Sequence, residues 1–170
     1  MLLLGIGSNL KSSYGDRFEN INLSISFLQK NKINVLKRSS FYETPSFPNI
    51  NNPKFINVVI EVSTLLSLEE FLSVLISTEE KLERKRGLKN DPRTCDIDLL
   101  DYNGQINNLY YKNLIFKVPH EELTLRNFVL YPLKEVAPNW HHPKTKEKVD
   151  TLINKLSEEN RKSIFKVQKS

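Results

Sequence analysis

The fold of this chain is decided by residues 67–104, SLEEFLSVLISTEEKLERKRGLKNDPRTCDIDLLDYNG. A capping box begins the stretch, because Ser67 is followed three residues later by Glu70, and each side chain can accept a hydrogen bond from the other residue's backbone N–H. The apolar residues that follow recur at helical spacing and are Leu68, Phe71, Leu72, Leu75 and Leu82. This pattern predicts an amphipathic helix.

A strand and a tight turn are predicted after this helix. Residues Thr94–Tyr102 have the composition of a buried strand. The dipeptide Asn103-Gly104 is typical of a type I′ hairpin turn, and we expect a short return through Gln105 and Ile106.

Upstream, the sequence predicts one strand, one helix and two more strands. Leu2–Ile6 is a short apolar run, and a helix follows behind Asp16 as its candidate cap. The apolar positions of that helix are Phe18, Ile21, Ile25 and Leu28. Two β-prone runs, Val35–Thr44 and Phe55–Val62, flank a Pro- and Asn-rich loop at 45–53.

The resulting order is βαββαβ, which is that of the ferredoxin-like α+β fold. In that fold an antiparallel sheet has both helices packed on one face. From about Tyr110 onward we expect a C-terminal helical extension, with helices near Asn127–Leu133 and Val149–Leu156.

The composition is typical of one intracellular globular domain. The 170 residues are 39% apolar and 26% charged. We expect one domain over residues 1–157 and a charged, solvated tail over 158–170. No apolar run suits a signal peptide or a membrane span, and the single cysteine, Cys95, is expected to be a reduced core residue. We therefore expect a cytoplasmic protein without a membrane partner, and the sequence does not decide its oligomeric state.

Asp96 and Asp98 are the first candidates for chemistry. Alternate side chains of a strand share a face, so these two carboxylates would project together while Ile97 and Leu99 face the core. Two carboxylates held side by side repel each other unless a cation lies between them, and Mg²⁺ prefers such oxygen ligands. A pair of solvated surface aspartates is the alternative that the motif alone leaves open.

Basic residues lie just upstream of the pair. The net charge of +5 fits an anionic partner without choosing among nucleotides, phosphorylated metabolites and nucleic acids. Arg86, Lys89 and Arg93 could meet phosphate oxygens, or could form a solvated basic face. Glu79 falls on the apolar stripe of the second helix and therefore needs a partner, whereas a lone His120 is more often structural than catalytic.

Five motifs together give the chain a specific resemblance. They are GIGSNL at 5–10, SSFYETP at 39–45, FIN at 55–57, PRTCDIDLL at 92–100, and Pro119-His120 with Arg126 and Phe128. In their order and spacing, from Leu3 to about Pro143, the chain resembles the 6-hydroxymethyl-7,8-dihydropterin pyrophosphokinase family of folate biosynthesis. The resemblance implies that pyrophosphate moves from ATP to the hydroxymethyl group of the pterin, with release of AMP.

The resemblance also implies the roles of individual residues. Two Mg²⁺ ions would be held by Asp96 and Asp98, and these two residues, Arg86 and Arg93 would be the catalytic set. ATP as co-substrate would contact Glu79, Arg86, Lys89, Arg93, Leu99, His120 and Arg126. The pterin would lie among Thr44, Pro45, Phe47, Phe55, Asn57 and Phe128. A flat heterocycle suits two aromatic rings, and Asn57 offers its edge both a donor and an acceptor, although the phenylalanines by themselves would suggest core packing.

The chain departs from the family pattern at three places. Asn90-Asp91 stands where many members have Trp-Gly, Lys89 where arginine is frequent, and Glu121 where a neutral or aromatic residue is found. Lysine retains the charge of arginine but loses its two-pronged hydrogen bonding. These changes bear on ATP affinity and loop closure, while the reaction class is expected to be unchanged.

Two other functions remain open from the residues. A non-catalytic ferredoxin-like module that binds RNA would need aromatic side chains on an open sheet face. A metal-dependent nucleotidyltransferase would also use paired aspartates on a strand, but it would release pyrophosphate in place of AMP. With ATP and the pterin as partners, we expect no nucleic acid partner.

Overall fold

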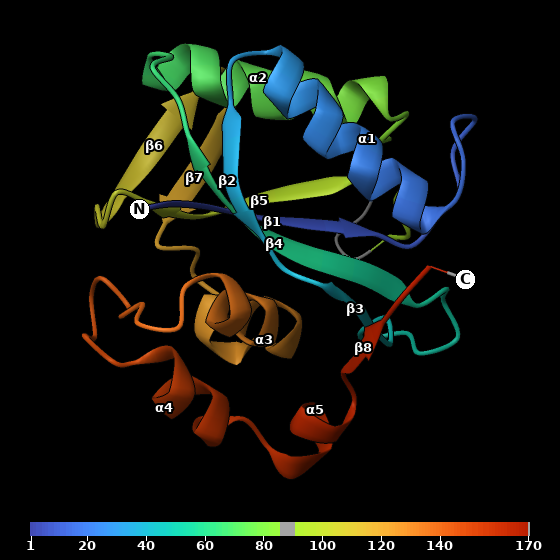
Figure 1. Ribbon diagram of the computed structural model, residues 1–170, viewed down its shortest axis with the longest axis vertical. Helices are drawn as coiled ribbons and strands as arrows, with labels where there is room; N and C mark the ends of the chain where they lie inside the picture. The colour runs from blue at the N-terminus through green and yellow to red at the C-terminus, as the bar shows by residue number, and fades with distance from the viewer. Residues whose placement is uncertain (86–90, 170) are drawn as a thin grey trace.

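Two layers of helices enclose one antiparallel sheet (Figure 1). The computed structural model describes residues 1–85 and 91–169. Its strands are β1 (Leu2–Ser8), β2 (Asn34–Arg38), β3 (Phe41–Thr44), β4 (Phe55–Ser63), β5 (Asp96–Tyr102), β6 (Asn107–Tyr111), β7 (Leu114–Val118) and β8 (Phe165–Val167). Its helices are α1 (Arg17–Lys30), α2 (Leu68–Lys81), the 3₁₀ turn η1 (Leu123–Leu125), α3 (Asn127–Val136), α4 (Val149–Lys155) and α5 (Glu158–Lys162).

The strand order confirms the ferredoxin-like α+β prediction. The main sheet runs β5-β1-β4-β3-β8, β2 also pairs with β4, and all of these pairs are antiparallel. The run 35–44, expected as one strand, is divided into β2 and β3. At the break the Ser39 hydroxyl accepts a hydrogen bond from the backbone N–H of Val59, at 3.0 Å. The side chain thus replaces a backbone partner, and the chain bends there while it remains beside β4.

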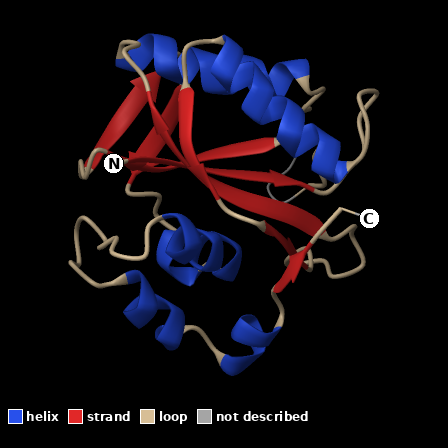
Figure 2. Ribbon diagram, viewed as in Figure 1, coloured by secondary structure: helices blue, strands red, loops and turns tan. Residues whose placement is uncertain are grey.

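Helices cover both faces of the sheet (Figure 2), and strand alternation divides the core into two clusters, one on each face. On β1, Leu2, Leu4 and Ile6 belong to the cluster under α1 and α2, whereas Leu3 belongs to the cluster under α3 and α4. Helix α2 begins at the expected capping box of Ser67 with Glu70, and α1 begins at the expected cap Asp16, which also forms a capping box with Glu19. Cys95 is buried in the first cluster as a free thiol, as expected.

The segment after β5 differs from the expectation. The turn at Asn103-Gly104 forms with positive φ angles of 55° and 72°, and the Gln105 N–H donates to the Tyr102 carbonyl at 3.1 Å. The expected return through 105–106 is wrong, however, because the chain does not pair again with β5. It forms β6, which pairs with β7 around a second turn where Lys112 has a φ of 50°.

The C-terminal segment is also more ordered than a solvated extension. Its described part contains α5 and β8, and β8 pairs antiparallel with β3 through Phe41–Glu43. Beyond β8, the Lys169 ammonium lies 2.8 Å from Glu19 on the first turn of α1. The segment therefore adds a strand to the sheet edge. Over the described ranges 1–85 and 91–169, no helix has the length and apolar character needed to cross a bilayer.

Candidate active site

Asp96 and Asp98 project from β5 on the sheet face that α3 covers. They stand opposite Gly7 and Gly5 of β1, which have no side chain to fill the space beside the carboxylates. A Cβ at Gly7 would lie 3.1 Å from the Asn57 Oδ1 atom and 3.6 Å from the Phe55 ring. A larger residue would therefore enter the space between the aspartates and the aromatic side of the site.

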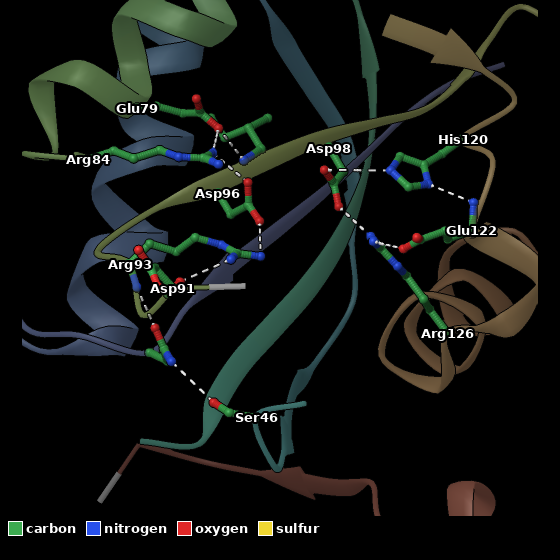
Figure 3. Close-up of polar contacts among 12 residues, drawn as sticks. Ser46, Glu79, Arg84, Asp91, Arg93, Asp96, Asp98, His120, Glu122 and Arg126 are labelled. Carbon is green, nitrogen blue, oxygen red and sulfur yellow. Dashed lines mark hydrogen bonds and ion pairs between the residues drawn. The ribbon is translucent and has the colours of Figure 1, made fainter. Parts of the chain in front are cut away.

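Asp96 lies between two arginines (Figure 3). Its Oδ1 is 2.5 Å from Arg84 Nη1 and its Oδ2 is 2.5 Å from Arg93 Nη2. Arg84 also pairs with Glu79, and Glu79 in turn accepts a hydrogen bond from the backbone N–H of Ile97 at 2.7 Å. Burial by itself would raise the pKa of Asp96, but Arg93 and Arg84 outweigh it and hold that pKa below its ordinary value.

Asp98 has longer ion pairs than Asp96, and its pKa is shifted in the opposite direction. Arg126 Nη1 lies 3.0 Å from its Oδ2, and His120 Nε2 lies 3.9 Å from its Oδ1. Arg126 also pairs with Glu122, whose backbone N–H donates to His120 Nδ1 at 3.2 Å. Burial raises the pKa of Asp98, and the charge of Asp96 adds to the effect, which the neighbouring cations offset only in part.

Arg93 and Arg126, which contact Asp96 and Asp98, also lie over phenylalanine rings. The Arg93 guanidinium lies 5.1 Å from the centroid of the Phe55 ring, and the Arg126 guanidinium lies 5.4 Å from that of Phe128. Both rings are half-buried. A guanidinium and a flat heterocycle can both contact the face of an aromatic ring, so Phe55 and Phe128 are candidates for stacking with a planar substrate.

Asn57 and Thr44 are the polar residues next to Phe55. The Asn57 amide donates to Thr44 Oγ1 at 3.1 Å, and both residues are buried, at 5% and 4% exposure. Pro45 is exposed, and Phe47 is 84% exposed. The structure thus brings Thr44, Phe55 and Asn57 together around Gly7, whereas Phe47 projects into solvent from the loop.

A cavity of about 230 Å³ runs along the free edge of β5, between α2 and β7. One side is charged and the other is apolar. Its charged lining includes Glu79, Arg84, Asp96, Asp98 and His120, and its apolar lining includes Leu75, Ile76, Leu99, Ile115 and Phe116. Asp96 and Asp98 therefore lie between this cavity and the rings of Phe55 and Phe128.

The remaining predicted residues divide into two groups. Arg86, Lys89 and Asn90 lie outside the described residues, so their roles stay predictions. Asp91 is exposed, and its carbonyl accepts a hydrogen bond from Arg93 Nη1 at 3.1 Å. Glu121 lines the cavity, but its carboxylate is 2.5 Å from Lys117 Nζ, so the negative charge expected there has a cationic partner.

Sequence reasoning missed two residues that the structure brings into the site. Arg84 was not among the predicted site residues, yet it joins Glu79 to Asp96. The sequence feature that pointed to it was Glu79, because a carboxylate on an apolar helix face requires a cation within reach. Asn9, in the GIGSNL motif, is 2% exposed and contacts two of the loops around the site. No local pattern pointed to that contact.

The chemistry of the two aspartates fits a divalent cation. Burial and then the charge of Asp96 raise the pKa of Asp98, and a cation between the two carboxylates would favour the ionised form. Within 1–85 and 91–169, no group of three or more His, Cys, Asp or Glu side chains could hold a metal ion. A metal held by Asp96 and Asp98 would therefore complete its coordination with water and with substrate oxygens, as Mg²⁺ commonly does.

Comparison with known proteins gives a consistent result. The family described as 7,8-dihydro-6-hydroxymethylpterin-pyrophosphokinase matches residues 3–138. A 2-amino-4-hydroxy-6-hydroxymethyldihydropteridine pyrophosphokinase of Aquifex aeolicus is 35% identical over 140 residues, which are 82% of this chain and 82% of that protein. A bifunctional protein FolKE of Lactococcus lactis is 36% identical over 156 residues, 91% of this chain and 42% of that protein.

Longer relatives and solved structures agree. A folic acid synthesis protein of Schizosaccharomyces pombe is 32% identical over 154 residues, and the match spans 90% of this chain but only 20% of that protein. The crystal structure of wild-type HPPK-DHPS from Plasmodium falciparum superposes with a TM-score of 0.68 at 15% identity, covering 91% of this chain and 44% of that one. At this identity the superposition supports the fold alone.

Proposed function

Because the chain belongs to the 7,8-dihydro-6-hydroxymethylpterin-pyrophosphokinase family, we propose that it transfers pyrophosphate from ATP to the hydroxymethyl group of 6-hydroxymethyl-7,8-dihydropterin, in folate biosynthesis. The observation that carries the proposal is the position of Asp96 and Asp98. They project from one face of β5 between a partly charged cavity and a pair of aromatic rings. A nucleotide and a pterin could meet there at the two carboxylates.

The charge balance of the described site supports metal-dependent use of ATP. Arg84, Arg93 and Arg126 are paired with Asp96, Asp98, Glu79 and Glu122, so these pairs leave no surplus of positive charge. A triphosphate entering alone would be repelled by the two aspartates. We infer that Asp96 and Asp98 hold two Mg²⁺ ions, which when bound neutralise charge on the entering and leaving oxygens.

The chain's own residues would position and stabilise the reacting groups. In the proposed reaction the pterin hydroxyl gives its proton to Asp98 or to water and its oxygen bonds to the β-phosphorus. The bond from that phosphorus to the α,β-bridging oxygen breaks, and AMP leaves. Arg93, Arg126 and His120 lie beside Asp96 and Asp98. They would bind phosphate oxygens when the two carboxylates hold metal ions. Such preorganised cations stabilise developing charge without reorganising during the reaction.

The cavity beside β5 suits the rest of the nucleotide. Its apolar lining, which includes Leu99, would accept a purine, and its charged end leads to the aspartates. Glu79 would act there mainly through Arg84. Arg86 and Lys89 are retained as proposed phosphate ligands on the family resemblance. We place the reaction in the cytoplasm, in keeping with a buried, reduced Cys95.

Product analysis tests the proposed reaction. The protein is incubated with Mg²⁺, the pterin and ATP labelled at the α- or γ-phosphate, and the products are separated. We expect AMP to carry the α label and the pterin diphosphate to carry the γ label. Release of labelled pyrophosphate would indicate nucleotidyl transfer, and absence of turnover under all conditions would contradict the proposal.

The structure weakens the RNA-binding alternative. A ferredoxin-like RNA-binding module uses an open sheet face with aromatic side chains. Here one face packs under α1 and α2, and the other buries Leu3, Val59 and Leu100 under α3 and α4. The helices on both faces therefore leave no broad aromatic platform on the central strands for stacked bases.

Phe128→Ala is expected to weaken pterin binding while leaving nucleotide binding nearly unchanged. Loss of one stacking ring should raise the Kd for the pterin about 10- to 100-fold, since a stacked aromatic pair and its buried area contribute roughly 1.5–3 kcal/mol. Isothermal titration with the pterin and, separately, with a non-hydrolysable ATP analogue measures both constants. Phe165→Ala is the matched control, because Phe165 lies 60% exposed on β8. An unchanged pterin Kd in Phe128→Ala would contradict the stacking assignment.

A further inference from the structure

Asn9, just after the end of β1, contacts two segments that surround the site. We call residues 44–57 the pterin segment, because they contain Thr44, Phe55 and Asn57. We call residues 91–99 the nucleotide segment, because they contain Arg93, Asp96 and Asp98. One buried side chain touches both.

The two ends of the Asn9 amide serve different segments. Its Nδ2 donates to Ser46 Oγ at 3.2 Å and to the Pro53 carbonyl at 3.0 Å, on the two sides of the loop in the pterin segment. Its Oδ1 accepts a hydrogen bond from the backbone N–H of Arg93 at 2.6 Å. Among the common side chains, a short amide is suited to donate on one side and accept on the other.

Backbone contacts strengthen the connection to Arg93. The N–H groups of Asn9 and Leu10 both donate to the Arg93 carbonyl, at 3.0 and 3.2 Å. Arg93 is therefore held through both of its peptide groups, and its side chain reaches Asp96. Ser46, on the other side, is 3% exposed, and its hydroxyl donates to the Pro53 carbonyl at 2.6 Å, which closes the loop.

Hydrogen bonds from α1 hold the loop that carries Asn9. Asn20 is fully buried, its Nδ2 donates to the Leu10 carbonyl at 2.9 Å, and its Oδ1 accepts from the Ser12 hydroxyl at 2.6 Å. At the other end of the loop Ser13 donates its N–H to Glu83, just after α2, at 3.0 Å. Asn9 is thus attached to a rigid layer, while its amide faces two loops.

We propose that Asn9 is a positioning residue that couples the nucleotide segment to the pterin segment. Asn9 touches no proposed substrate position itself, and the inference rests on the proposed function. When a nucleotide orders Arg93, the hydrogen bonds through Asn9 order Ser46 and Pro53, so part of the ordering of the pterin segment is complete before the pterin arrives. The two substrates then bind with positive coupling.

Asn9→Ala tests the coupling directly. The pterin is titrated into protein with and without a saturating non-hydrolysable ATP analogue and Mg²⁺. In the wild type we expect the analogue to tighten pterin binding about tenfold or more, and in Asn9→Ala less than about threefold. The Kd for the analogue alone should change less than about threefold, so the loss lies in the coupling.

Amide hydrogen exchange gives a second readout that does not depend on turnover. Adding the analogue and Mg²⁺ to the wild type should slow exchange at residues 46–52 even without pterin. In Asn9→Ala this protection should be lost, although exchange in β1 and β4 stays slow. In steady-state kinetics at saturating ATP, the variant should raise the KM for the pterin more than it lowers kcat.

Trp140→Phe is the matched control for general destabilisation. Trp140 is 5% exposed, and its Nε1 donates to Asp101 at 2.8 Å in the other core layer. Both variants lose buried hydrogen bonds and should unfold at lower temperature, but only Asn9→Ala should lose the coupling. Undiminished coupling and protection in Asn9→Ala, or equal losses in Trp140→Phe, would overturn the role of Asn9. Failure of the wild type to bind the two ligands or release AMP would overturn the proposed function and this inference with it.

Discussion

Asp98→Asn is expected to lower the rate of AMP release by about a thousandfold or more without lowering stability. The variant loses one of the two charges that would hold Mg²⁺ at the phosphates, and electrostatic stabilisation of this kind supplies several kcal/mol of the rate enhancement. Burial and the Asp96 charge raise the pKa of Asp98, which means that its ionised form is held at a cost in the folded state. A neutral amide removes that cost, and Arg126 keeps Glu122 as a partner.

The sign of the stability effect follows from that pKa. A carboxyl whose folded pKa is raised contributes stability that is fully present below its unfolded pKa and is lost as the pH rises through the folded value. At neutral pH the wild type therefore carries an ionised Asp98 at a disadvantage. Chemical denaturation should show an unfolding free energy for Asp98→Asn equal to or above that of the wild type.

Asp101→Asn, on the same strand, is expected to show the opposite pattern. Asp101 is 3% exposed and accepts hydrogen bonds from Trp140 Nε1 at 2.8 Å and from the Gly104 N–H at 2.7 Å. An amide nitrogen facing either donor leaves a buried group unpaired, which costs about 1–3 kcal/mol. We expect lower stability with near-normal AMP release at temperatures where the variant is folded. Normal turnover in Asp98→Asn, or an equal loss in Asp101→Asn, would rule out the metal-site hypothesis.

Arg84→Met is expected to reduce the unfolding free energy by about 3–5 kcal/mol at neutral pH, as is typical when one partner of a buried ion pair is removed. The Arg84 side chain is only 18% exposed and separates the carboxylates of Glu79 and Asp96. Although burial acts against its charge, the two carboxylates raise the pKa of Arg84. Urea denaturation monitored by circular dichroism measures the loss. Lys134→Met is the matched control, because its pair with Asp150 is more than half exposed and should contribute less than about 1 kcal/mol.

The pH dependence and a double variant identify the cause of that loss. Without Arg84, the adjacent carboxylates should have a raised pKa in the folded state, so stability is present at low pH and is lost as the pH rises through that pKa. Arg84→Met should therefore recover part of its stability on acidification from pH 7 to about pH 5. Arg84→Met combined with Glu79→Gln should recover stability at neutral pH, since the glutamine side-chain carbonyl can still accept the Ile97 N–H. Simple additivity of the two changes would argue against a charge triad.

Local sequence signals predicted the elements that carry the site. The capping boxes at Asp16 and Ser67 act within one helical turn, so α1 and α2 were predictable from neighbouring residues. The two-residue period of β5 placed Asp96 and Asp98 on one face, and the structure confirms that face opposite Gly7 and Gly5. The choice of pterin and ATP came from the family resemblance, since phenylalanines and a basic run are equally compatible with core packing and a solvated surface.

Features that depend on distant contacts were not predictable in the same way. The turn at Lys112 lacks the Asn-Gly signal, and the pairing of β8 with β3 joins residues more than 120 positions apart. The sequence did not distinguish Arg84 from the basic residues that follow it, Lys85 and Arg86. The direction of Arg84 is set after α2, where Glu83 has a φ of 63° and the Arg84 N–H returns to the Glu79 carbonyl at 3.1 Å.

The sequence alone determined the βαββαβ order as far as β5, the shared face of the aspartates and the family, because each depends on residues close in the chain or on motifs in a fixed order. Tertiary structure alone decided which cation meets Asp96, where the cavity lies and that Asn9 joins two loops. These depend on side chains up to 84 positions apart being packed together. Hydrogen bonds and ion pairs act over a few ångströms of space, and only the folded chain sets those distances.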